Sequence, residues 1–149
     1  MSLAGNALRR QRTIVDTVEL LTRQALGPLL PTLQVLRSRD HPGDIRDHLV
    51  NLYFLAGDVD QGFGTQEDDA RFVVRIATRN GVKRAGAALP VDDELRSVGA
   101  DLLDVLAADE DLGGIVGKFV LSHWEYGEPK GSTYTYLALI FAVEFVTEE

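Results

Sequence analysis

Two long segments near the C-terminal end of the chain alternate between two faces at every second position. The first runs from Ile115 to Tyr126, the second from Tyr134 to Val146, and a turn at 127–131 joins them. Such spacing, with β-branched and aromatic residues, indicates an antiparallel pair of strands. One face of the second segment is apolar and consists of Leu137, Leu139, Phe141, Val143 and Phe145. The other face is mixed and consists of Tyr134, Tyr136, Ala138, Ile140, Ala142 and Glu144.

The length of these two segments constrains what they can do in a small fold. At about 3.3 Å per residue, each would extend ~40 Å if unbroken. A strand of that length either overhangs the rest of the domain or bends at a bulge, and an overhanging strand can pair with a neighbouring subunit. Because the second face is mixed rather than polar, we expect protein on both sides of the last strand.

The rest of the chain predicts two helices and shorter strands. Apolar residues recur at helical spacing from the start to about Ala25, where Gly27-Pro28 ends the helix, and a second helix is expected over 90–107. Shorter strands are expected at 29–37, 49–55 and 71–79. The predicted fold is α+β: two helices packed on a mostly antiparallel sheet of about four to six strands, with a long C-terminal hairpin, in one domain over residues 1–149.

The second helix has an apolar stripe interrupted by a glycine. Gly99 lies within the stripe formed by Leu95, Val98, Leu102 and Val105. A glycine inside a helix costs roughly 1 kcal/mol relative to alanine. We therefore expect a close neighbour at Gly99. After this helix, Asp111, Gly113 and Gly114 are predicted to form the turn into the first long strand.

Composition excludes several classes of function. The 149 residues include no cysteine, which excludes disulfides and thiol chemistry. The sequence has no run of eighteen apolar residues and no signal-peptide pattern, so we expect a soluble protein that does not contact a membrane. A net charge of −8 argues against specific nucleic-acid binding. Arg9, Arg10 and Arg12 form the one basic cluster, which we interpret as a solvated start of a helix.

An acidic, glycine-rich segment lies between two expected strands. Residues 56–64 are predicted to be a loop, and the segment and its flank contain Asp58, Asp60, Phe63, Glu67, Asp68 and Asp69. Counted from Asp58, the residues do not match an EF-hand, because position six is Phe63 and position twelve is Asp69. We interpret these six residues as candidates for a loop that orders on a partner protein. A site for a divalent cation remains the alternative.

No arrangement of residues predicts catalysis or a cofactor. His41, His48 and His123 are scattered and fit no metal-ligand spacing. The sequence has no nucleophile elbow, phosphate-binding loop or G-x-G-x-x-G motif. The protein is therefore expected not to be an enzyme and to need no cofactor. Four aromatic residues near the terminal turn are candidates either for the core or for a subunit interface: Trp124, Tyr126, Tyr134 and Tyr136.

The order of these elements resembles the tail terminator proteins of long-tailed phages, the group similar to minor tail protein U. The resemblance covers most of the chain in element order, and its motif-like part runs from Leu106 to Val146, including Asp-Leu-Gly-Gly at 111–114. It implies a homo-oligomeric ring, usually a hexamer, that caps the tail tube, stops its growth and docks the head. The implied partners are further copies of the chain, the tail tube protein and the head–tail connector. The implied location is the virion tail, and the host cytoplasm during assembly.

Two other functions remain open. A head–tail joining or closure protein would also be a small ring-forming α+β subunit. A ligand-binding domain or small enzyme that holds a divalent cation in the acidic segment is the third possibility.

Overall fold

The computed structural model describes residues 2–84 and 86–149. The helices are α1 (Leu3–Leu26) and α2 (Val91–Leu106). The main sheet contains β1 (Gln34–Leu36), β2 (His48–Gln61), β3 (Thr65–Arg79), β6 (Lys118–Gly127) and β7 (Tyr134–Glu148), and β4 (Lys83–Arg84) and β5 (Ala87–Ala88) form a small second sheet. The predicted α+β class, the two helices, the strand number and the long C-terminal hairpin are confirmed.

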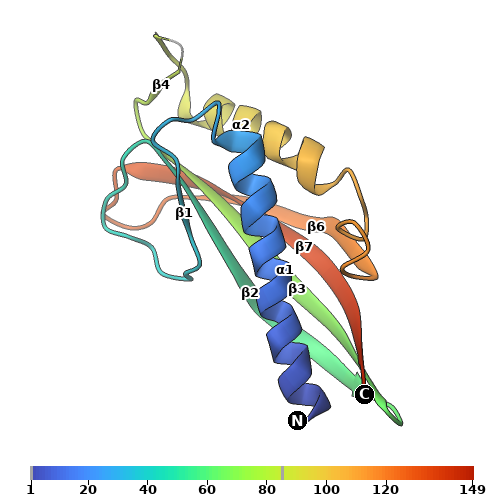
Figure 1. Cartoon of the computed structure of the whole chain (residues 1–149). Coiled ribbons are helices and arrows are strands. Elements are labelled where there is room, and N and C mark those ends of the chain that lie inside the picture. Colours follow the sequence, from blue (N-terminus) through green and yellow to red (C-terminus); the bar gives the residue numbers. More distant parts are fainter. Residues whose placement is uncertain (1, 85) are drawn as a thin grey trace.

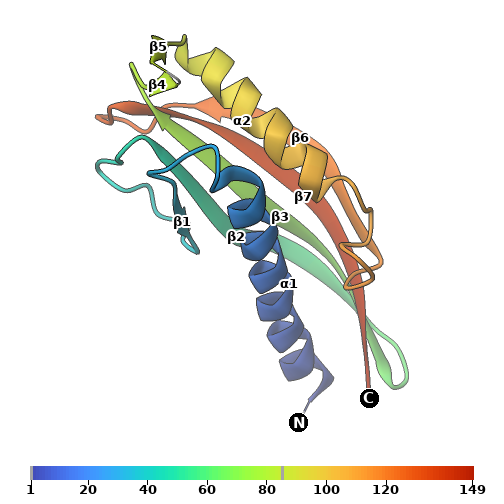
Figure 2. The same ribbon diagram turned by 45° about the horizontal axis from the view of Figure 1, so that its top comes forward.

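The main sheet has the strand order β1-β2-β3-β7-β6. All neighbouring strands are antiparallel except β1 and β2, which are parallel and pair only at residues 34–36 with 49–51. Both helices pack on the same face of this sheet, as Figures 1 and 2 show. We call this the helix face, and the opposite one the outer face. The β2–β3 turn, the start of α1 and the C-terminus lie at one end of the molecule (Figure 1).

The core lies between the helices and the helix face. The aromatic rings of Phe72, Phe119 and Phe141 are fully buried there, and Phe119 stacks on Phe141 with 4.4 Å between ring centroids. The expected close neighbour of Gly99 is Leu137, because a Cβ added to Gly99 would lie 3.1 Å from its Cδ2 atom. The apolar alternation of β7 thus faces α2 directly. Within the described residues, no helix is long and apolar enough to cross a membrane.

The predicted loop at 56–64 is wrong. Strand β2 continues to Gln61 and β3 starts at Thr65, so the acidic residues form a long hairpin rather than a loop. The reason is tertiary: β3 pairs with β7 along its whole length, from Thr65 opposite Glu148 to Arg79 opposite Tyr134. The overhanging end of β7 therefore provides a template for a polar strand that composition alone assigns to a loop.

Two predicted strand boundaries are also wrong. The segment 29–37 contributes only β1, because Leu29 and Leu30 continue from α1 in turns whose amides donate to the carbonyl of Leu26. The strand expected from Ile115 begins at Lys118. Positive φ at Gly113 (72°) and Gly114 (92°) turns the chain there, and the carbonyl of Asp111 accepts hydrogen bonds from Gly114 and Val116.

Residues 37–47, which we call the strap, lie against the outer face near one end of the sheet. Buried Arg75 of β3 donates to the carbonyls of Arg39 and Asp40 in the strap, at 3.4 and 2.7 Å. The Arg75 guanidinium lies 5.7 Å from the ring centroids of both Tyr53 and Tyr136. Burial lowers the pKa of strap residue His41, the charge of Arg75 lowers it further, and Asp40 raises it. The strap is thus attached largely through its backbone carbonyls.

Candidate protein interface

The four aromatic candidates lie on opposite faces of the sheet. Trp124 and Tyr126 belong to β6, the edge strand, and their side chains lie on the helix face of the sheet. They are 61% and 37% exposed, and their rings contact each other in a T-shaped arrangement. Tyr136 is half-buried on the outer face, 5.4 Å from the His41 ring. Tyr134 is only 2% exposed, and its hydroxyl donates to the carbonyl of Pro42.

Of the two possibilities given for the aromatic residues, the structure places Tyr134 in the core, because the strap covers it. Burial also raises the pKa of its hydroxyl. The two exposed aromatic residues, Trp124 and Tyr126, belong instead to an apolar groove between β6 and α2. We call this 410 Å³ groove the β6 groove, and its lining residues are Arg96, Gly99, Ala100, Leu103, Leu121, Trp124, Tyr126, Leu137 and Leu139.

A second groove lies at the other edge of the sheet, between the first turns of α1 and strand β2. It has a volume of 370 Å³, and we call it the β2 groove; Leu8, Phe54, Leu55 and Val59 are among its apolar lining residues. Leu8 is 65% exposed, although the helical pattern suggests a core position. Sequence reasoning missed this groove, because the exposure of Leu8 depends on how far α1 extends past the edge of the sheet.

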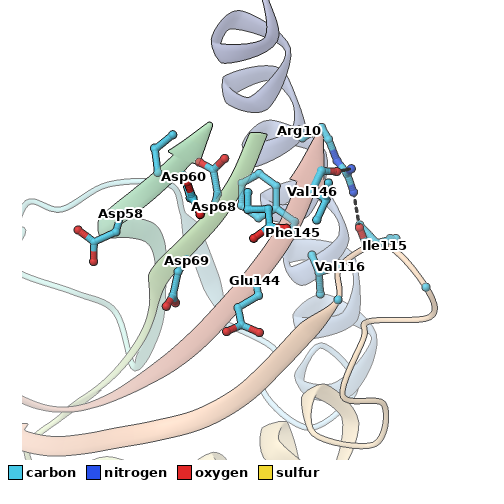
Figure 3. A pocket seen from close by; sticks show the side chains of 14 residues that line it. Arg10, Asp58, Asp60, Asp68, Asp69, Ile115, Val116, Glu144, Phe145 and Val146 are labelled. Carbon is cyan, nitrogen blue, oxygen red and sulfur yellow. Dashed lines mark hydrogen bonds between the residues drawn. The ribbon is translucent and has the colours of Figure 1, made fainter. Parts of the chain in front are cut away.

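The acidic hairpin carries its charges mostly on the outer face. Asp58, Asp69 and Glu144 are neighbours in one row across β2, β3 and β7, and Asp60 pairs with Glu67 in a further row. Like charges opposite one another are unfavourable in a sheet, and Lys118 of β6, which pairs with Glu144, adds a positive charge at the end of the first row. Asp68 is turned to the helix face and is 8% exposed. Figure 3 shows Asp69 and Glu144 pointing to the same side.

These acidic residues border a groove of 690 Å³ that Arg10 closes from the side of α1 (Figure 3). Arg10 donates to the carbonyls of Ile115 and Val146, and its guanidinium lies 5.7 Å from the centroid of the Phe145 ring. The interpretation of the basic cluster as a solvated helix start is therefore wrong for Arg10. Among the described residues, no group of three or more His, Cys, Asp or Glu could hold a metal ion. Phe63, at the tip of the hairpin, is fully exposed.

A buried polar cluster holds α2 against the sheet. Glu94, in the first turn of α2, is completely buried and contacts His48 Nε2 at 2.9 Å and Arg84 Nη1 at 3.1 Å. Arg84 also contacts Ser97 and Asp101 of α2. His48 begins β2 and Arg84 lies in β4, so the cluster connects three elements. Sequence spacing gives no signal for it, because its members are 46 and 10 positions from Glu94.

No protein-family model and no curated protein sequence matches the chain. Among the solved structures, the chain is similar to one described as "Virion of native gene transfer agent (GTA) particle". The TM-score is 0.53 at 15% sequence identity, and the match covers 89% of this chain and 92% of the other. At this identity the similarity shows a common fold, which extends over nearly the whole of both chains.

Proposed function

We propose that this chain is a non-enzymatic structural protein of a phage-like particle. The observation that carries this proposal is the fold shared with a chain of a gene transfer agent virion over 89% of this chain. The surface is consistent with assembly, because two apolar grooves lie at opposite edges of one sheet. Exposed apolar side chains gathered at such grooves are typical of sites that bind other proteins.

Within that class, we propose a tail terminator: a ring that caps the tail tube, ends its polymerisation and docks the head. The order of elements in the sequence supports this role. Phe63 and the acidic end of the β2–β3 hairpin project from the body of the subunit and would contact the tube protein or the connector. A projecting hairpin with an exposed aromatic tip can be buried by a partner without any rearrangement of the core.

The ring is tested by the absolute mass in solution, from light scattering on a sizing column over a range of concentrations. We expect a species of about six times 16.4 kDa. Replacing Trp124 with serine should give monomers, because this side chain is the most exposed aromatic residue of the β6 groove. The matched control is Leu20→Ser, since Leu20 is 57% exposed on α1 and lines neither apolar groove. A ring that survives Trp124→Ser unchanged would remove this residue from the interface.

The role in ending the tube is tested by adding the protein to its tail tube protein during polymerisation and measuring tube lengths by electron microscopy. We expect shorter tubes with a cap at one end. Phe63→Ser should restore long tubes without changing the solution mass, whereas Leu29→Ser, on an exposed residue after α1, should leave capping intact. Unchanged tube lengths, together with binding to the head connector, would favour the head–tail joining role.

A further inference from the structure

We propose that the ring closes by continuing the main sheet from one copy to the next. In this arrangement β6 of one copy pairs antiparallel with the unpaired part of β2 in its neighbour, and Trp124 enters the neighbour's β2 groove. This inference rests on the proposed self-assembly, and it names both halves of a head-to-tail contact. Five observations on the two edges of the sheet support it.

The first observation is that both edges are open. Strand β1 covers β2 only at residues 49–51. Within the described residues, β2 from Leu52 to Gln61 has no strand on the side away from β3, and β6 has none on the side away from β7. Unpaired backbone amides and carbonyls along such edges readily pair with another strand.

Strand direction is the second observation. Because β2 and β7 are each antiparallel to β3, they run in the same direction, and β6 runs opposite to both. A rotation about an axis along the strands keeps strand directions unchanged. In a ring around such an axis, β6 of one copy therefore meets β2 of the next as an antiparallel neighbour, and the sheet continues with the more favourable pairing.

The third observation is that the two edges have matching lengths. Between the same two rows of the sheet, the inner strands advance by four residues, 70–74 in β3 and 139–143 in β7. Over those rows the open part of β2 advances by five residues, 52–57, and β6 also advances by five, 119–124, because each edge strand contains one bulge. A bulge at one edge alone would break the register with a partner, whereas one at each edge, on either side of the row of Phe72, lets the two edge strands stay matched.

The apolar side chains at the two edges also correspond, which is the fourth observation. On the helix face, Leu121 lies in the row of Phe54, and Trp124 lies in the adjoining row of Leu52. Leu121 and Trp124 are 38% and 61% exposed on the β6 side, and Leu8 and Leu55 are 65% and 45% exposed on the β2 side. Pairing the edges would cover all four of these side chains. A tryptophan side chain alone buries roughly 150–250 Å² of surface.

Charge is the fifth observation. Arg9 and Arg12 are exposed on α1. Their height along the sheet is given by nearby Leu8, which lines the β2 groove together with Gly57 and Ala70. At the other edge, the exposed residues 109–111 are all acidic, and the carbonyl of Glu110 accepts a hydrogen bond from Phe119. Phe119 lies in the same row as Gly57 and Ala70. The basic and acidic segments thus lie at one height on opposite flanks, where a neighbour would bring them together.

Two contacts of Arg39 have to change for the edges to pair. Arg39 Nη2 donates to the carbonyl of Phe54 at 2.7 Å, at the level where β2 has no strand neighbour, and the guanidinium lies 6.0 Å from the centroid of the Tyr53 ring. A pairing strand would supply an amide to this carbonyl instead, and Arg39 is exposed, so its guanidinium can turn into solvent. The hydrogen bond is exchanged for another, and an exposed contact between a cation and a ring contributes little, so the cost is small.

The absence of native cysteine allows a direct cross-linking test. Ala56 and Val120 lie in the same row at opposite edges, and three strand spacings separate them within one copy, roughly 14 Å, too far for a disulfide. The variant Ala56→Cys with Val120→Cys is oxidised, and in parallel treated with a short bis-maleimide that tolerates an offset of one residue. We expect a ladder of covalent oligomers on a denaturing gel that ends at a closed species.

The outcomes of this test distinguish a failure of the inference from a failure of the proposed ring. The two single-cysteine variants should give no ladder, and strong dimers from either one would mean that like edges meet, which overturns the inference. A hexamer by light scattering without a ladder would also overturn it and leave the ring intact. A monomer at every concentration, with no cross-link, would overturn both.

A charge exchange gives a second readout that does not depend on cysteine geometry. Arg9→Glu with Arg12→Glu should raise the dissociation constant by about tenfold or more at low salt, and so should Asp109→Lys with Glu110→Lys. All four changes in one chain should restore assembly to within about threefold, because the exchanged charges meet across each contact. Equal weakening in the combined variant would show that these segments do not face each other.

Discussion

Replacing Arg75 with methionine is expected to lower the free energy of unfolding by about 2–4 kcal/mol. Arg75 is 5% exposed, and among the described residues no carboxylate forms an ion pair with it. Its charge is balanced by the carbonyls of Arg39 and Asp40 and by the faces of two tyrosine rings. Methionine keeps most of the length and the apolar stem but removes every donor, so the strap loses its main attachment.

The change in Arg75→Met is measured by urea denaturation and by limited trypsin digestion, because the strap contains the cleavage sites Arg37, Arg39 and Arg46. We expect cleavage after these three residues to accelerate while the sheet remains folded. Arg71→Met is the matched control, since Arg71 is an exposed arginine on the same face of β3 and should change stability by no more than about 0.5 kcal/mol. Equal digestion of the two variants would show that Arg75 does not hold the strap.

The parts of the fold that sequence predicts are those in which local pattern and tertiary packing agree. The alternation from Leu137 to Phe145 correctly predicts the buried face of β7, because every second residue is large and apolar. Pro90 and the acidic residues after it indicate the start of α2 for a similar reason, since the dipole of a helix favours negative charge there. In these segments the local and the long-range preferences favour the same structure.

The β2–β3 hairpin is the segment where those preferences conflict. Glycine and aspartate dominate 56–64 and indicate a loop, yet the amides and carbonyls of this segment pair with β3, which in turn pairs with the end of β7. A polar strand of this kind lacks the apolar alternation from which strands are predicted in a sequence. Its face assignment appears only in the structure, where Gln66, Asp68 and Ala70 are buried and Glu67 and Asp69 are exposed.

The candidate interface was predicted in part for a related reason. Aromatic enrichment singled out Trp124 and Tyr126, whose exposure the structure shows, but the same argument also selected Tyr134, which the strap buries. Composition identifies residues that are suited to an interface, whereas exposure depends on which segments cover them. The β2 groove is absent from any local pattern, because α1 and β2 form it from positions about fifty residues apart.

The second large effect is expected at Arg84, whose replacement with methionine should cost about 3 kcal/mol. Glu94 is fully buried, and this change would leave its carboxylate with His48 as its remaining partner. Arg84→Met with Glu94→Gln should be more stable than Arg84→Met alone, because the double variant no longer buries an unbalanced charge. Both are measured by urea denaturation. The exposed pair of Arg23 with Glu19 supplies the control, and Arg23→Met should change stability by about 0.5 kcal/mol at most.

The relation between the single and double variants is what distinguishes an electrostatic role from a packing role. If Arg84 stabilises the protein only by packing against α2, the losses in Arg84→Met and Glu94→Gln should add. If Arg84 balances the buried charge, the second change should recover about 1–2 kcal/mol of the loss. Because the cluster joins β2, β4 and α2, a recovery would also show that charge balance at Glu94 contributes to holding these three elements together.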